Sequence, residues 1–321
     1  MSAAAATAAP SDGMRLRRDR FGNAIQFYAP GLKRWQTSEW TPARPNRFVP
    51  VSVTGDKCAL QCDHCETKVL KGMVDLTAAE VDLFASAERL HAQGTDGILV
   101  SGGSTRTGEV PLAAHASAMR RVKQELGMRV IVHAGVVSPE SAGALAAAGV
   151  DGVMLDIIGA DATIREVYHL ERTVADFERS LELLAARDLR IIPHIVIGLH
   201  YGRLVGEWTA LEMIGRYPVS TLILVVLTPL TGTPMAHLSP PPLADVAGFF
   251  ADARAAMPDT RVNLGCGRPM GDLKVALDKA AIDHGLNGIA YPADGMVAYA
   301  RDAGLEPEYY EYCCSLTWAG A

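Results

Sequence analysis

The sequence predicts an α/β protein built as a parallel (β/α)8 barrel of the TIM type. Short β-branched and aliphatic runs recur along the chain, Ala-rich segments with helical periodicity separate them, and Gly or Asp-Gly precedes several runs. Apolar runs without alternation are typical of strands that are buried on both faces of a parallel sheet. Eight such runs at the repeat length of a βα unit favour the barrel, and a doubly wound sheet is the alternative.

The expected strands cover residues 51–54, 97–100, 129–132, 152–155, 190–197, 221–227, 261–264 and 287–290. Ser138 followed by Pro139 is typical of a helix start, and Gly149 is typical of the end of the same helix. The carboxyl ends of parallel strands share one face of a barrel, its top, where functional residues gather. We therefore look for the active site in the loops that follow the strands.

The chain divides into four expected segments. Small, polar residues predict a flexible N-terminal tail over residues 1–20, and residues 21–48 form an extension before the barrel. The barrel itself spans residues 49–304. Residues 305–321 form a C-terminal tail with a cysteine pair, which we expect to fold over and close the top of the barrel.

Composition excludes several classes of protein. The 321 residues hold 30 Lys plus Arg and 36 Asp plus Glu, and 30 − 36 gives a net charge of −6, which argues against a nucleic-acid partner. No apolar run approaches the ~18 residues of a membrane span. Six cysteines are too few for a disulfide scaffold, and three of them lie close together, which indicates metal chemistry in a reducing compartment. We expect a cytoplasmic protein.

The most specific motif is the C-x3-C-x2-C run of Cys58, Cys62 and Cys65, directly after the first expected strand. This spacing lets each thiolate bind a different iron of a [4Fe-4S] cluster and leaves the fourth iron open. Electron-transfer clusters normally have four cysteines, so three imply chemistry at the open iron. The alternative is a zinc site completed by His64, but adjacent His64 and Cys65 reach two tetrahedral corners only with difficulty.

This motif, with His64 before the last cysteine, resembles the radical S-adenosylmethionine (SAM) superfamily. The resemblance implies that the open iron of the cluster chelates the amino and carboxylate groups of SAM. It also implies that one electron from the cluster cleaves SAM to methionine and a 5′-deoxyadenosyl radical, which abstracts hydrogen from an unactivated C–H bond. Such chemistry requires a pocket that excludes water and stray hydrogen donors.

A second motif, at the end of the second expected strand, resembles the glycine-rich motif of the same superfamily. It comprises Ser101, Gly102 and Gly103, whose backbone carbonyls are expected to receive the SAM amino group. The next residue, which is usually acidic in the family, is Ser104 here.

Two further segments resemble superfamily motifs in barrel order. Ile197 and Gly198, ending the fifth strand, resemble the segment that packs on adenine, and His64 is expected near the adenine as well. Residues 228–234 resemble the Pro-x-x-Gly-Thr-Pro loop of biotin-synthase-like members.

Three polar residues on the expected strands are also candidates. Asp156 closes the fourth strand, and a carboxylate there is expected to bind the ribose of SAM or the substrate. His133 and His194 lie on the third and fifth strands, where each either lines the mouth of the barrel or is hydrogen-bonded within it.

A second cysteine set comprises Cys266 at the end of the seventh strand and the pair Cys313 and Cys314 in the tail. A tail folded over the top would bring the three together as ligands of a second iron–sulfur cluster. The fourth ligand is then Arg268, Ser315 or an exogenous sulfide. The alternative is that Cys266 is a small buried residue and the tail pair is incidental.

These motifs together, over residues 21–316, resemble the biotin synthase homologues that include subunits of two-component lipoyl synthases. The resemblance implies sulfur insertion at C6 or C8 of an octanoyl chain that is amide-linked to a lipoyl carrier protein. Implied partners are that octanoylated carrier, a homologous second radical SAM subunit, and ferredoxin or flavodoxin as reductant. The alternatives are a radical SAM enzyme with another small-molecule or cofactor-precursor substrate and a non-catalytic zinc-binding barrel.

Overall fold

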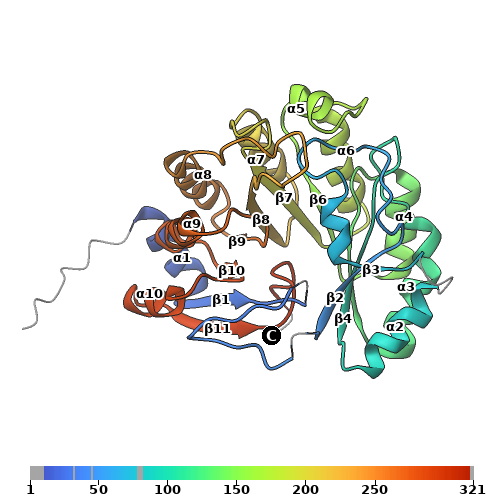
Figure 1. Ribbon diagram of the computed structural model, residues 1–321, viewed down its shortest axis with the longest axis horizontal. Helices are drawn as coiled ribbons and strands as arrows, with labels where there is room; N and C mark the ends of the chain where they lie inside the picture. The colour runs from blue at the N-terminus through green and yellow to red at the C-terminus, as the bar shows by residue number, and fades with distance from the viewer. Residues whose placement is uncertain (1–10, 32, 45, 78–81, 319–321) are drawn as a thin grey trace, which may run out of the picture.

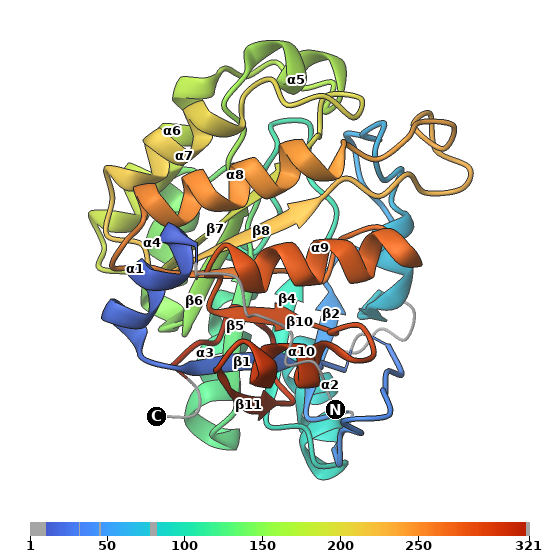
Figure 2. The ribbon, with the colours of Figure 1, turned by 90° about the vertical axis from the view of Figure 1, so that its left-hand side faces the viewer.

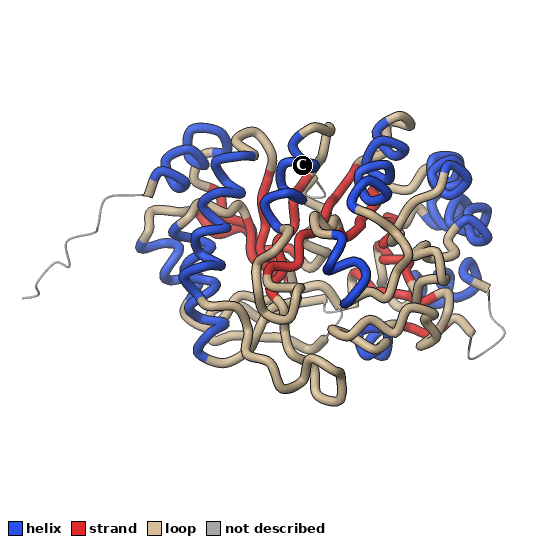
Figure 3. The backbone as a smooth tube through the Cα atoms, turned by 90° about the horizontal axis from the view of Figure 1, so that it is seen from above, coloured by secondary structure: helices blue, strands red, loops and turns tan. Residues whose placement is uncertain are grey.

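A single parallel sheet curls inside a layer of helices (Figures 1 and 3). The computed structural model describes residues 11–31, 33–44, 46–77 and 82–318. The sheet has 11 strands in the order β11-β1-β10-β9-β8-β7-β6-β5-β4-β2-β3. Strands β4 to β10 lie side by side in chain order. Consecutive βα units give this order in a barrel, whereas a doubly wound sheet reverses its strand order near the middle.

All eight expected strands are present, which confirms the α/β barrel class. They are β2 (Phe48–Ser52), β4 (Gly97–Ser101), β5 (Arg129–His133), β6 (Gly152–Asp156), β7 (Ile191–Ile197), β8 (Thr221–Val226), β9 (Arg261–Leu264) and β10 (Gly288–Ala290). Three more strands extend the edges: β1 (Ala24–Tyr28), β3 (Val74–Asp75) and β11 (Glu306–Tyr310). Within the described residues no strand pairing joins β3 to β11, so the barrel is partly open.

Helices cover the outer face of the sheet (Figure 2). They are α1 (Asp12–Phe21), α2 (Leu83–Ala92), α3 (Ala116–Leu126), α4 (Pro139–Ala148), α5 (Asp161–Glu166), α6 (Val174–Ala185), α7 (Glu207–Gly215), α8 (Leu243–Ala256), α9 (Asp272–Asp283) and α10 (Met296–Asp302), with 3-10 turns η1 (Lys68–Gly72) and η2 (Ala113–His115). Helix α4 begins as expected: the Ser138 hydroxyl accepts the Ser141 N–H at 3.1 Å. Over the described ranges, no helix is long and apolar enough to cross a membrane.

The N-terminal segment that was expected to be a flexible tail contains a helix. Residues 12–21 form α1, which contacts α8 and α9, while residues 1–10 lie outside the described part of the chain. Arg17 is fully buried, and its guanidinium donates to the carbonyls of Gly22 (2.8 Å) and Ala24. Because Ala24 is the first residue of β1, the second of these bonds ties α1 to the sheet, although the Arg17 Nε has no partner among the described residues.

The C-terminal tail lies inside the barrel near the amino ends of the strands, which differs from the expected closure of the top. The Tyr312 ring lies 4.9 Å from the guanidinium of Arg129, the first residue of β5. The Trp318 ring lies 4.7 Å from the guanidinium of Arg190, which precedes β7. Between them Leu316 is only 1% exposed. The tail is aromatic and apolar, and the barrel interior is where it removes that surface from water.

This packing predicts that the tail is part of the core. Leu316→Ala should lower the free energy of unfolding by about 2–4 kcal/mol, because it leaves a cavity among buried side chains. Leu243→Ala, at a residue that is 37% exposed on α8, is the control and should cost clearly less. Urea unfolding followed by circular dichroism measures both, and equal losses would show that the tail is not packed as described.

Candidate active site

A cavity of about 520 Å³ lies inside the barrel and brings together residues from β2, β4, β5, β6 and β7 and from the loops. Its lining includes the three cysteines of the C-x3-C-x2-C motif and Cys266. Most of the remaining wall is apolar, with Leu60, Leu70, Leu99, Val110, Val136, Met154, Leu170 and Phe177 among the lining residues. An apolar cavity of this size with a few convergent polar groups is typical of a small-molecule or cofactor site.

The cysteine loop follows β2, and all three of its cysteines line the cavity. The backbone N–H of Ser104 donates to the sulfur of Cys58 at 3.3 Å. Cys65 accepts a hydrogen bond from the Cys62 thiol, which with the neighbouring His64 lowers the pKa of Cys65 to about 4 against the opposing effect of burial. Hydrogen bonds to sulfur favour the thiolate, the form that binds iron. The donor set therefore fits a [4Fe-4S] cluster with three protein ligands.

The glycine-rich motif packs directly on this loop. A Cβ at Gly103 would lie 2.0 Å from the carbonyl oxygen of Lys57 and 2.6 Å from the Cα of Cys58, so only glycine fits there. The Gly103 N–H donates to the Thr54 hydroxyl at 2.7 Å. Ser101, Gly102 and Gly103 all line the cavity, so the structure brings this motif and the cysteines together. Their contact with the SAM amino group stays a prediction.

Gly103→Ala should therefore displace the Cys58 turn and prevent cluster assembly while the barrel still folds. After anaerobic reconstitution we expect little bound iron and weak absorbance at about 400 nm. Gly248→Ala is the control, since that helical glycine has open space where a Cβ would lie. A Gly103→Ala protein with the iron content of the control would contradict the packing argument.

Polar side chains from three neighbouring strands form a network on the cavity wall. Asp156 accepts a hydrogen bond from the Tyr168 hydroxyl at 3.1 Å, and its other oxygen lies 3.6 Å from His133 Nε2. The rings of His133 and His194 lie 5.5 Å apart, and His194 is the partner of Asp156 in the β6–β7 ladder. All four residues line the cavity.

Electrostatics fixes the charge of two members of the network. Burial alone would raise the pKa of Asp156, but the hydrogen bond from His133 and the nearby histidines outweigh it and hold that pKa well below its usual range. Burial, reinforced by His133, lowers the pKa of His194 to about 4. His194 is therefore neutral near pH 7, and its Nδ1, 3.1 Å from the Ile192 carbonyl, carries the proton. This leaves Nε2 as an acceptor for a ligand.

His64, expected near the adenine of SAM, also lines the cavity. Its ring lies 5.2 Å from that of Tyr168. Its Nδ1 is buried and has no hydrogen-bond partner in the described part of the chain. Buried polar atoms normally have a partner, so this nitrogen marks a place for a ligand group. Tyr168 lies in the loop between α5 and α6, and no local motif around it predicts a place in the site.

Ile197 and Gly198, expected to pack on adenine, are placed elsewhere. Neither lines the 520 Å³ cavity in the part of the chain that the structure describes. Side chains alternate between the two faces of a strand, and Ile197 is three residues after the inward-facing His194. Ile197 therefore points away from the barrel interior, and it is fully buried in the core. The Gly198 N–H donates a hydrogen bond to the Glu207 carboxylate at 2.8 Å.

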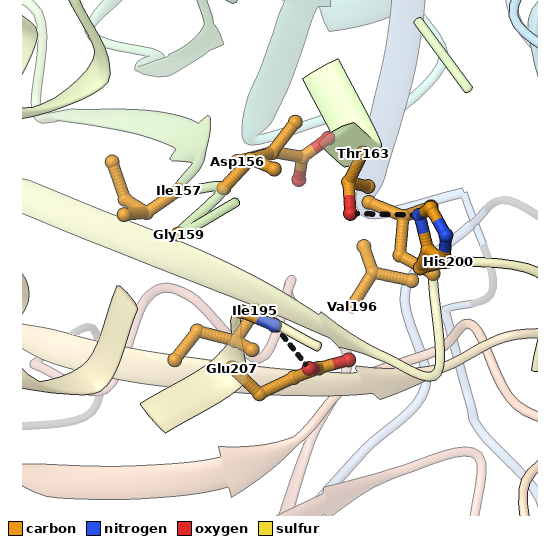
Figure 4. A pocket seen from close by; sticks show the side chains of 11 residues that line it. Asp156, Ile157, Gly159, Thr163, Ile195, Val196, His200 and Glu207 are labelled. Carbon is orange, nitrogen blue, oxygen red and sulfur yellow. Dashed lines mark hydrogen bonds between the residues drawn. The ribbon is translucent and has the colours of Figure 1, made fainter. Parts of the chain in front are cut away.

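Beside this segment is only a small hollow, shown in Figure 4. It measures about 20 Å³ and lies between the ends of β6 and β7 and the helices that follow them. Thr163 and His200 are hydrogen-bonded at 3.2 Å on its wall. Asp156 lines both this hollow and the larger cavity. This volume has room for about one water molecule and none for a base.

The three cysteines of the second set lie near enough to influence one another electrostatically. Cys266 opens into the cavity, while Cys313 and Cys314 are buried in the tail. Burial and the neighbouring Cys313 raise the pKa of Cys266, and a hydrogen bond from Cys314 lowers the pKa of Cys313 to about 7. No three His, Cys, Asp or Glu side chains among the described residues are arranged to hold a single metal ion.

A buried ionic group fixes the loop that carries Cys266. The Arg268 guanidinium binds both oxygens of Asp278, at 2.7 and 3.1 Å, and donates to the Gly265 carbonyl at 2.7 Å. Lys274 lies 3.1 Å from the same carboxylate. Two cations thus share one anion, which leaves a buried excess of positive charge behind Cys266. With a further bond to the Tyr291 carbonyl at 3.1 Å, Arg268 uses four of its five N–H donors here, which disfavours it as a ligand of a second cluster.

Comparison with known families identifies the class. The model of the radical SAM superfamily matches residues 52–212, which is 161 of the 321 residues. The chain belongs to the radical SAM superfamily, and it is a radical SAM enzyme whose cofactors are a [4Fe-4S] cluster and SAM. This excludes the non-catalytic zinc-binding barrel.

The most similar curated relatives among those found are biotin synthases. The enzyme of Chlorobium phaeovibrioides is 25% identical over 222 residues, covering 67% of this chain and 65% of the relative. The biotin synthase of Ruegeria pomeroyi is 24% identical over 275 residues, covering 81% of this chain and 82% of the relative. The biotin-synthase-like resemblance is thereby confirmed at low identity.

Solved structures support the fold. Methylornithine synthase matches with a TM-score of 0.59 and 13% identity, covering 92% of this chain and 87% of that one. The [FeFe]-hydrogenase maturase HydG matches with a TM-score of 0.63 and 15% identity, covering 96% of this chain and 69% of that one. At these identities the likeness concerns the barrel alone.

Proposed function

We propose that this radical SAM enzyme inserts sulfur into an octanoyl chain on a lipoyl carrier protein, as one component of a lipoyl synthase. The observation that carries the proposal is that the cluster cysteines and Cys266 line one apolar cavity. When bound, the cluster and SAM supply reductive cleavage of SAM and removal of a hydrogen atom from an unactivated C–H bond.

The walls of the cavity suit an alkyl chain. Leu60, Leu70, Leu99, Val110 and Phe177 offer an apolar surface that holds a saturated chain and keeps water away from the reacting carbon. The acceptors of the polar network, Asp156 and His194, suit the hydroxyl groups of ribose or an N–H of the substrate. Asp156 thus keeps the ribose-binding or substrate-binding role expected from its position.

The second cysteine set is proposed to hold the sulfur source as an auxiliary iron–sulfur cluster on Cys266, Cys313 and Cys314. The excess positive charge of Arg268 and Lys274 over Asp278 is buried nearby, and a buried charge favours a counter-charge beside it. A cluster with three thiolates supplies that negative charge. In the overall reaction each C–H bond becomes a C–S bond, and one SAM is consumed for each hydrogen atom removed.

The similar biotin synthases suggest a second candidate function, sulfur insertion into a biotin precursor. Identities of 24–26% favour it, and biotin synthesis also inserts sulfur. The lipoyl proposal is preferred because the terminal cysteine pair resembles that of two-component lipoyl synthase subunits. The proposed partners are the octanoylated carrier, a homologous second radical SAM subunit and ferredoxin or flavodoxin. The cytoplasm, a reducing compartment, suits these free cysteines.

Product analysis tests the substrate. The reconstituted enzyme, given SAM, reductant and an octanoyl-lysyl peptide, should yield a monothiolated or lipoyl peptide with or without the second subunit. Mass spectrometry measures the peptide, and 5′-deoxyadenosine is quantified in parallel. Cys58→Ala should form neither product. If 5′-deoxyadenosine forms but the peptide gains no sulfur in either format, the lipoyl proposal is wrong.

Iron and sulfide counts test the second site separately. With two [4Fe-4S] clusters the protein binds about 8 irons, and Cys266→Ala should retain only about 4. Met270→Ala is the control, because Met270 is nearby in sequence, 66% exposed and outside the cavity lining. A Cys266→Ala protein that keeps the full count would remove the auxiliary cluster from the proposal.

A further inference from the structure

Asp63, which directly follows Cys62 in the motif, joins the cysteine loop to two other loops. One carboxylate oxygen lies 2.8 Å from His169 Nε2, in the loop between α5 and α6. The other accepts a hydrogen bond at 2.8 Å from the Tyr201 hydroxyl, in the loop between β7 and α7. The Asp63 backbone N–H donates to the Val167 carbonyl at 3.0 Å. We call Asp63, His169 and Tyr201 the Asp63 clamp.

The backbone at two members of the clamp has an unusual conformation. His169 and Tyr201 each have a φ of 53°, in the left-handed region that residues with large side chains seldom adopt. Both direct their side chains to the same carboxylate. Burial and the hydrogen bond to Asp63 raise the pKa of Tyr201 to about 12, so its hydroxyl keeps the proton that it donates. Strained residues persist only where surrounding contacts hold them, and Asp63 supplies such a contact to both.

Tyr168 is the residue that the clamp holds against the cysteine loop. The residues on both sides of it contact Asp63, one through its carbonyl and the other through its side chain. The Tyr168 ring lies 5.2 Å from the ring of His64, and its hydroxyl donates to Asp156 at 3.1 Å. These three residues line the 520 Å³ cavity, whereas Asp63 is not among the described residues that do. Any effect of Asp63 on a ligand in the cavity must therefore pass through the residues that it holds.

We propose that Asp63 is a positioning residue for SAM binding: it holds Tyr168 on the cavity wall, and Tyr168 holds the Asp156 carboxylate in the orientation that receives SAM. A carboxylate offers about four acceptor positions, so Asp156 can accept from Tyr168 and from a ligand hydroxyl at once. A group that is held in place before binding loses less freedom when the ligand arrives, which strengthens binding. This role rests on the ribose-binding role proposed for Asp156, and it is independent of the acyl substrate and of the sulfur source.

The dissociation constant of SAM tests the proposal. Anaerobic equilibrium dialysis measures it on reconstituted protein with an oxidised cluster, so that SAM binds without being cleaved. Asp63→Ala and Tyr168→Phe should each raise the dissociation constant about 5- to 20-fold, because each frees the carboxylate of the network. Asp63→Asn keeps an acceptor for His169 and should restore part of the affinity. Asp294→Ala is the control, since Asp294 also joins two loops, through the Ser38 N–H and hydroxyl at 2.7 and 2.8 Å, but is not among the described residues that line the cavity.

Combined substitutions test whether Asp63 acts through Tyr168. In a Tyr168→Phe protein, Asp63→Ala should raise the dissociation constant by less than about twofold, because the contact that it supports is already absent. Tyr201→Phe and His169→Ala each remove one bond of the clamp and should give intermediate losses. Iron content and the electron paramagnetic resonance spectrum of the reduced cluster without SAM should match the wild type in all these variants, since the cysteines and the Gly103 contact are unchanged.

Wild-type SAM affinity in Asp63→Ala, or a loss that is as large in the Tyr168→Phe background as in the wild type, would overturn the positioning role. Should Asp63→Ala lose iron, His169→Ala takes its place in both comparisons, because that side chain is 47% exposed and its removal leaves the core intact. Asp156→Ala tests the ribose-binding role itself: weaker SAM binding there, with wild-type binding in Asp63→Ala, rejects the positioning role alone. No acyl substrate is present, so the result does not depend on the lipoyl proposal.

Discussion

The contact between the end of β4 and the cysteine loop is the constraint on which the site depends. Strands β2 and β4 are neighbours in register, with Ser52 opposite Ser101, so the loops that follow them compete for the same space. Glycine at position 103 lets both backbones occupy it, and the Ser104 N–H then points at the Cys58 sulfur. The cysteine loop and the glycine-rich backbone are therefore positioned by one close approach, and any side chain at residue 103 would separate them.

The curl of the sheet gives the cavity two chemically different walls. Neighbouring strands β5, β6 and β7 carry His133, Asp156 and His194 to one level, while apolar side chains cover most of the rest. Asp156 is kept charged and His194 is kept neutral, so both present hydrogen-bond acceptors to the cavity. Cys266 also lines the cavity, on a loop that Arg268 fixes through the Gly265 carbonyl. The cavity therefore combines a polar network, an apolar surface and a thiol, and the proposed sulfur insertion would use all three.

The sequence predicts the eight barrel strands because each is a short apolar run that is buried on both faces. The same criterion fails for β1 and β11, which carry Gln26, Glu306 and Glu308 and pair at the edge of the sheet. Pro307 in β11 would exclude a central strand but is tolerated at an edge. The sequence also does not predict where the C-terminal tail packs. The apolar residues around Leu316 require burial, but they do not specify which end of the barrel provides it.

Local sequence spacing likewise predicts some residues of the candidate site, while contacts between distant parts of the chain decide the others. Cys58, Cys62 and Cys65 converge because three and two intervening residues fix their separation, whereas Ile197 faces away because strand parity, not motif likeness, decides its direction. Cys266 reaches the cavity from a strand some 200 residues later in the chain, through contacts that no local pattern encodes. This thiol and the cluster cysteines line the same cavity, so the barrel fold, and not any local motif, brings the two ends of the sequence signal together.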